Sequence, residues 1–127
     1  MEFPKDLRYT KDHEWARIAG SRVTIGITAF AVEQLGDITM VELPQVGDEV
    51  TTGESMGTVE SVKSVSDLYA PISGKVVKIN DKLEDEPELV NNAPYGDGWM
   101  VEVESGGTVD ADLLDQPAYA ELVARES

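Results

Sequence analysis

Hydrophobic and polar residues alternate in short runs along most of the chain, and Gly or Pro separates many of these runs. The runs cover residues 13–18, 22–27, 38–43, 56–62, 65–69, 75–79 and 99–103. Alternation with a period of two is typical of a strand that has one face on a core. Many short strands at close spacing favour a small barrel or sandwich over alternating βα units. We therefore predict a mainly β fold of short antiparallel strands.

Two other segments have helical character. Thr28 is a suitable N-cap for residues 29–35, and Gly36 is a suitable stop after them. Near the C-terminus, Pro117 fits the start of a helix, and apolar residues recur at helical spacing through about 117–125. We predict a short helix near 28–35 and a C-terminal helix that packs one face on the β core.

The length of 127 residues fits one domain, spanning 1–127, with one core. No apolar run approaches the roughly 20 residues that a membrane-spanning helix needs. The N-terminal segment lacks the features of a secretory signal and of an organellar presequence. We expect a cytoplasmic protein of bacterial type, or a mitochondrial matrix protein from which a presequence has been removed.

The amino-acid composition limits the chemistry that the chain itself can perform and the partners that it can bind. Cysteine is absent, which excludes disulfides, zinc-thiolate sites and thiol catalysis by the chain itself. Any sulfur chemistry would therefore need a prosthetic group. The chain has 25 acidic and 10 basic residues, a formal net charge of −15, which argues against nucleic acid and anionic membranes as partners. The charge suits docking on basic surfaces, but plain solubility or a saline cytoplasm explains it equally well.

The segment at 59–74 carries the most informative pattern. Two alternating strands flank a centre in which small or polar residues surround Lys63. A hairpin over about 56–70 would place Lys63 at the outermost point of a stiff β scaffold, with its long side chain in solvent. A modifying enzyme and a tethered cofactor both require such a position.

Around this lysine the chain resembles the H proteins of the glycine cleavage system, and the resemblance extends over nearly its whole length. The matching segments are 9–15, 26–28, 31–38, 43–44, 60–64, 70–74, 90–91, 94–96 and 98–100, with Leu113 and Tyr119. The resemblance implies a lipoyl-domain-like, flattened barrel-sandwich hybrid. Ser64 and Asp12 occupy positions that vary in the family, and the acidity is higher than the family leads us to expect.

The resemblance also implies a carrier rather than an enzyme. The lysine of the family's Glu-Ser-Val-Lys core is lipoylated, which carries over to Lys63 and implies one covalent lipoate per chain. Glu60 and Gly74 stand at positions associated with recognition by the lipoylating enzyme. The implied partners are a pyridoxal-phosphate glycine decarboxylase, an aminomethyltransferase and a dihydrolipoyl dehydrogenase, between which the arm carries the aminomethyl group of glycine.

A lipoyl-lysine arm has about ten single bonds of roughly 1.5 Å each and sweeps a radius on the order of 14 Å. When loaded it ends in a cationic amine, which a carboxylate could hold away from water. We expect Glu14 and Asp67 to contact the loaded arm, with Asp12 as a weaker third. The alternative is that these acids are ordinary residues on strand faces.

Other interpretations remain open. Lys63 could be an ordinary solvated lysine, and the carrier could deliver lipoyl groups to other enzymes or be a non-catalytic relative with an interaction role. A biotin carrier is disfavoured because Val62 and Ser64, rather than methionines, flank the lysine. A lipoyl domain of a 2-oxoacid dehydrogenase is disfavoured because its Asp-Lys-Ala core is missing. His13 is the single histidine, so a metal site is poorly supported, and we interpret His13 as a structural strand residue.

Overall fold

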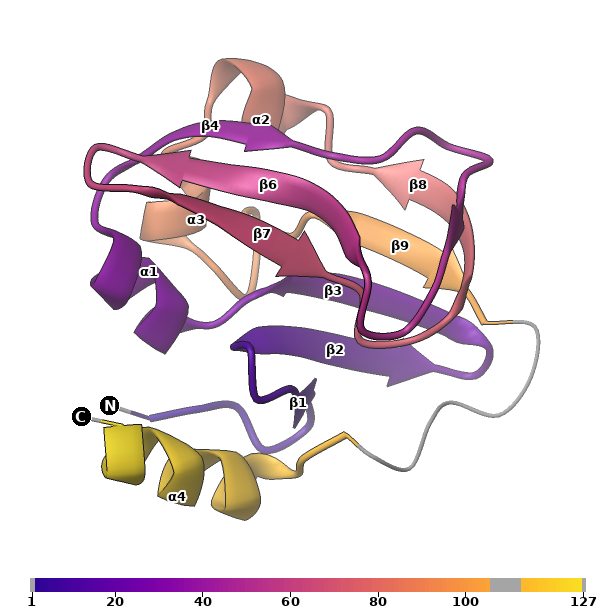
Figure 1. The fold of residues 1–127 in the computed structure, drawn as a ribbon. Helices are drawn as coiled ribbons and strands as arrows, with labels where there is room; N and C mark the ends of the chain where they lie inside the picture. Colours follow the sequence, from indigo (N-terminus) through magenta and orange to yellow (C-terminus); the bar gives the residue numbers. More distant parts are fainter. Residues whose placement is uncertain (1, 106–112, 127) are drawn as a thin grey trace.

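The computed structural model describes residues 2–105 and 113–126. Within these residues, two antiparallel sheets pack against each other without closing into a barrel, and helices lie at their edges (Figure 1). The mainly β prediction is confirmed, in its sandwich form. No helix of the described part is long and apolar enough to cross a membrane.

The larger sheet has six strands in the order β1-β2-β3-β9-β8-β5. Their bounds are Arg8–Tyr9 for β1, Glu14–Ala19 for β2, Arg22–Ile27 for β3, Val101–Glu104 for β9, Gly74–Ile79 for β8 and Glu49–Val50 for β5. The smaller sheet has the order β4-β6-β7, with bounds Ile38–Glu42, Ser55–Ser61 and Val65–Tyr69. Consecutive strands β6 and β7 form a hairpin in which Val59 pairs with Ser66.

Four helices complete the described fold. They are α1 Ala29–Leu35, α2 Lys82–Asp85, α3 Leu89–Asn92 and α4 Gln116–Glu126. The sequence signals around α1 are confirmed, because the Ala31 amide donates to Thr28 Oγ1 and the Gly36 amide donates to the Val32 carbonyl. The C-terminal helix is also confirmed. The pattern did not reveal α2, which is a single turn in an acidic segment and buries only Leu83.

The core lies between the two sheets. The larger sheet contributes alternate residues such as Val23, Ile25 and Val103, and the smaller sheet contributes Val59 and Leu68. Each of these side chains is almost fully excluded from solvent. The β6–β7 hairpin is therefore attached to the core through the inward residues of both of its strands.

A second, aromatic cluster joins α4 to the larger sheet. Tyr119 of α4 stacks on Tyr9 with ring centroids 4.5 Å apart, and Phe3 meets the Tyr119 ring edge-on. Trp15 and Phe30 belong to the same cluster. Trp15 is fully buried, and its indole nitrogen donates to the Pro94 carbonyl. This cluster closes the end of the molecule that α4 covers.

Candidate functional site

The turn between β6 and β7 is held by the side chain of Ser61. The Ser61 hydroxyl oxygen accepts hydrogen bonds from the amides of Lys63 and Ser64, at 3.2 and 3.1 Å. The Ser61 amide donates to the Ser64 carbonyl at 2.8 Å. Ser61 is itself buried, so a fixed group satisfies the backbone of the turn from inside. Lys63 therefore projects from a defined loop rather than from a loose one.

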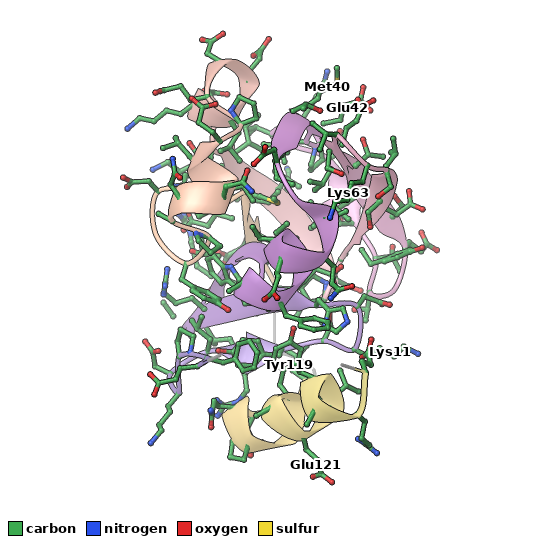
Figure 2. The ribbon with its side chains drawn as sticks, turned by 90° about the vertical axis from the view of Figure 1, so that its left-hand side faces the viewer. Lys11, Met40, Glu42, Lys63, Tyr119 and Glu121 are labelled. Carbon is green, nitrogen blue, oxygen red and sulfur yellow. The ribbon has the colours of Figure 1, made fainter. Side chains whose placement is uncertain are left out.

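Lys63 is exposed in this turn. The turn forms the left edge of Figure 1, so Lys63 faces the viewer in Figure 2. Its side chain passes over Gly36, where a Cβ would stand 3.3 Å from Lys63 Cε. Gly36 also has a φ of 81°, which favours glycine. Both the turn after α1 and the space for the lysine stem therefore call for glycine at this position.

Exposed apolar side chains lie on both sides of the lysine turn. Val62 and Val65 are 66% and 62% exposed, and Met40 on the neighbouring strand β4 is 50% exposed. The amine is accessible to an enzyme, and the apolar residues around it offer contact area for one.

Glu14 is a buried carboxyl that lines a largely apolar cleft. The cleft has a volume of about 470 Å³. Its walls include Thr10, Asp12, Glu14, Tyr69, Leu114 and Leu122. Thr10 Oγ1 donates to Glu14 Oε1 at 2.5 Å, and the Tyr69 amide donates to Glu14 Oε2 at 3.3 Å. These contacts join the start of β2 to the end of β7.

The burial of Glu14 changes its acidity. The pKa of this carboxyl is raised from 4.5 to about 7. Loss of solvent is the main cause and the nearby Asp12 charge adds to it, whereas the hydrogen bonds from Thr10 and Tyr69 partly oppose the rise. A carboxyl with such a pKa exchanges its proton readily near neutral pH. It can therefore remain neutral in an empty cleft and ionise beside a cation.

The other predicted acids are exposed. Asp67 lies on β7, where Ser55 Oγ donates to Asp67 Oδ1 at 3.2 Å and the Tyr69 hydroxyl donates to Asp67 Oδ2 at 3.4 Å. Asp12 lies in the turn before β2 and lines the cleft with Glu14, whereas Asp67 does not line it. The structure thus brings Asp12 and Glu14 together and leaves Asp67 on the strand that connects the cleft to the lysine turn.

Glu60 and Gly74 lie in different sheets. Glu60 is half-buried on β6 and pairs with Val65, next to the lysine turn. Gly74 begins β8, at the opposite end of the molecule from that turn (Figure 1). A Cβ on Gly74 would lie 2.3 Å from the Glu104 carbonyl oxygen. Close packing of β8 on β9 therefore requires glycine there independently of any recognition role.

The interpretation of His13 as a strand residue is wrong, because it precedes β2 in a turn with a φ of 71°. Its role is nevertheless structural. Nδ1 lies 2.8 Å from the Tyr119 hydroxyl, and Nε2 lies 3.2 Å from Glu126 Oε1. His13 thus ties the N-terminal turn to α4. Among the described residues, no group of three or more His, Cys, Asp and Glu side chains could hold a metal ion.

Comparison with known proteins decides the family. The family model for the glycine cleavage H-protein matches residues 7–126. The chain belongs to this family. A glycine cleavage system H protein of Anaeromyxobacter sp. (strain K) is 54% identical over 127 residues, 99% of each chain, and a probable one of Haloarcula marismortui is 54% identical over 125 residues, covering 97% of this chain and 98% of the relative.

A solved structure supports the same assignment. The crystal structure of a glycine cleavage system H protein from Mycobacterium marinum has a TM-score of 0.86 and 43% sequence identity, and the match covers 98% of both chains. The family resemblance predicted from the lysine segment is therefore confirmed, together with its fold.

Sequence reasoning named the lysine but missed the groups that support it. Ser61 belongs to the Glu-Ser-Val-Lys motif, which gave it no role. Its use as a hydrogen-bond acceptor for the turn follows only from its inward orientation. The Asp37 carbonyl, which accepts from the Val62 amide at 3.1 Å, left no signal at all in the sequence because a backbone group does this work. The apolar wall of the cleft was also missed, because Leu114 and Leu122 are distant from Glu14 in the chain.

Proposed function

We propose that this chain is the lipoyl-bearing carrier of a glycine cleavage system and that the Lys63 amine holds the lipoyl group in amide linkage. The observation that carries the proposal is an exposed lysine at the turn of a hairpin whose strands are anchored in the core. The family assignment supports the carrier role. A carrier needs no catalytic groups of its own, since it raises the effective concentration of a tethered group at its partners' active sites.

The residues present fit a lipoyl group. The chain has no cysteine, so a disulfide must be brought by the cofactor. The Lys63 residue is exposed, and its amide and that of Ser64 are hydrogen bonded to the Ser61 hydroxyl. When bound, the group supplies a reducible disulfide that carries the aminomethyl unit. Lys63 supplies the attachment point and the reach.

Recognition by the lipoylating enzyme is assigned to Glu60 and Gly74. Glu60 stands beside the lysine turn and can contact an enzyme that approaches Lys63. Gly74 acts at a distance, through the close packing that keeps β8 in place. The proposed partners are this enzyme, a pyridoxal-phosphate glycine decarboxylase, an aminomethyltransferase and a dihydrolipoyl dehydrogenase, which together place the protein in the compartment where glycine is degraded, the cytoplasm in a bacterium.

Glu14 and Asp67 are assigned to the loaded arm. From Val65 to Tyr69, β7 advances about 13 Å, at ~3.3 Å per residue. An arm attached at Lys63, two residues before Val65, has a reach of the same order, so it can follow β7 past Asp67 in the direction of the Glu14 cleft. Glu14 would release its proton and pair with the cationic end of the arm, and the apolar walls would exclude water. Asp12 lines the same cleft and adds negative charge.

Intact mass and peptide mapping test the attachment. After co-expression with a lipoyl ligase, we expect the mass of one lipoyl group on Lys63 and none in the Lys63→Arg variant. Lys75→Arg changes an exposed lysine of β8 and is the matched control, in which Lys63 should be modified as in wild type. Modification at another lysine would overturn the assignment. Reconstitution with the three partner enzymes separates a glycine-cleavage carrier from a lipoyl relay, which would donate its group without supporting glycine turnover.

The rate at which the loaded protein loses its aminomethyl group tests the Glu14 assignment. We expect Glu14→Gln to accelerate the loss about tenfold, the effect of removing one charge-assisted hydrogen bond. Glu33→Gln, at an exposed position of α1, should leave the rate unchanged. Equal loss from wild type and Glu14→Gln would show that Glu14 is an ordinary strand residue.

A further inference from the structure

The side-chain amide of Asn91 connects α3 to the segment that follows α1. Asn91 Nδ2 donates to the Gly36 carbonyl at 2.9 Å, and Asn91 Oδ1 accepts from the Ile38 amide at 2.9 Å. The two bonds lie on either side of Asp37. One planar group therefore fixes both ends of a three-residue stretch of backbone.

This stretch in turn supports the lysine turn. The Asp37 carbonyl accepts a hydrogen bond from the Val62 amide at 3.1 Å, directly before Lys63. The stem of Lys63 passes over Gly36, whose carbonyl is the one bound by Asn91. Residues 36–38 thus contact the turn through the backbone next to the lysine and through the space that its side chain crosses.

The position of Asn91 is fixed by the short helix that carries it. Its neighbour Val90 is fully buried in the core, and the Ala93 amide closes the turn of α3 by donating to the Leu89 carbonyl at 2.8 Å. The chemistry at residue 91 is demanding, because the group must donate to one backbone atom and accept from another. Aspartate keeps the acceptor but puts an oxygen against the Gly36 carbonyl, and leucine removes both bonds.

We propose that Asn91 is a positioning residue for the modification of Lys63. Through residues 36–38 it holds the Val62–Lys63 backbone in the orientation that the lipoylating enzyme binds, without touching Lys63 itself. The proposal rests on the assignment of Lys63 as the lipoylation site. Without Asn91 the turn samples other orientations, so the competent fraction falls and the apparent affinity for the modifying enzyme falls with it.

Backbone hydrogen exchange tests the structural half of the proposal without any lipoyl chemistry. In Asn91→Asp and Asn91→Leu, we expect the Val62 amide to exchange at least about fivefold faster, as follows from the loss of one supporting hydrogen bond. The amides of Val59 and Val76, in the core strands, should keep their wild-type rates. The control pair Asn92→Asp and Asn92→Leu changes an exposed residue of the same helix and should leave Val62 protected. An unchanged Val62 rate in both Asn91 variants would overturn the proposal, as would equal acceleration at all three amides.

Lipoylation kinetics test the functional half. With a lipoyl ligase acting on the full chain, the Asn91 variants should show a KM about fivefold higher and an unchanged kcat, whereas the Asn92 variants should match wild type. Reaction of the Lys63 amine with trinitrobenzenesulfonate should be the same in all forms, because the amine stays exposed. Wild-type kinetics in both Asn91 variants would overturn the proposal. If wild type itself is not lipoylated at Lys63, the proposed function fails, and the exchange rates still decide whether Asn91 holds the turn. Asn91→Asp conserves size and serves if Asn91→Leu does not fold.

Discussion

Glu14 has two places in the structure, as a link between two strands and as a lining residue of the cleft. Its carboxyl is only 2% exposed and accepts two hydrogen bonds, which suits a structural residue that joins β2 to β7. It also forms the polar part of an otherwise apolar cleft. Burial makes the ionised form costly, so an incoming cation that pairs with Glu14 relieves a cost already present in the fold.

The pH dependence of stability measures this cost. Burial raises the pKa of Glu14 from 4.5 to about 7, so the folded state binds the proton more tightly than the unfolded state. The associated stabilisation is complete below pH 4.5 and is lost as the pH rises through 7. Relative to Glu14→Gln, wild type should therefore lose about 3 kcal/mol of unfolding free energy between pH 4.5 and pH 8. Urea unfolding at several pH values provides the measurement, and parallel curves for the two proteins would contradict a buried, proton-binding Glu14.

At the scale of elements, α4 is attached by the hydroxyl of Tyr119 as well as by its ring. The hydroxyl lies 2.7 Å from Thr28 Oγ1 and 2.8 Å from His13 Nδ1, so it links α4 to the N-cap of α1 and to the turn before β2. Thr28 is fully buried. Because Leu122 of the same helix lines the cleft, the attachment of α4 also fixes one wall of the Glu14 site.

Removing the Tyr119 hydroxyl should therefore destabilise the protein. Tyr119→Phe keeps the stacking on Tyr9 but leaves Thr28 and His13 without this partner, which should cost about 1–2 kcal/mol of unfolding free energy. Tyr69→Phe is the matched control, because its hydroxyl is exposed and bonds to Asp67 at 3.4 Å, and it should change stability by less than about 0.5 kcal/mol. Chemical denaturation of the three proteins in parallel provides the comparison. Equal stabilities for the two variants would mean that the ring alone holds α4.

At the scale of the whole molecule, acidity is the dominant property. The formal net charge is −15, and among the described residues the one Lys or Arg side chain that forms ion pairs is Arg22, with Glu102 and Glu104. Arg22 is largely exposed, so these pairs contribute little. Most of the negative charge is therefore balanced only by counterions, and the folded state concentrates it.

Salt should stabilise such a molecule. Raising NaCl from 20 to 500 mM shortens the screening length severalfold, and we expect the unfolding free energy to rise by about 1 kcal/mol. Thermal or urea unfolding at fixed pH provides the measurement, with an uncharged osmolyte series to separate screening from solvent exclusion. A stability that falls with salt would show that favourable ion pairs outweigh the repulsion.

Local signals were enough to predict much of this architecture. Alternation located the longer strands but not the two-residue strands β1 and β5. Thr28 and Gly36 marked both ends of α1, because cap and stop residues act on the backbone beside them. The short helix α2 was not predicted, since a single turn with one buried residue has no periodicity to detect. His13 was misplaced because it ends a turn in which its amide donates to the Thr10 carbonyl, and the alternating pattern does not reveal this turn.

The sequence by itself therefore determined the longer strands, the helices α1 and α4 and the lysine at a hairpin turn, all of which depend on neighbours along the chain. Only the tertiary structure decided the features that depend on contacts between residues far apart in the chain. These are the burial and raised pKa of Glu14, the closing of the cleft by Leu114 and Leu122, and the bridge from Asn91 to residues 36–38. The physical reason is that desolvation and side-chain hydrogen bonds depend on which surfaces meet in space, and chain spacing does not encode this directly.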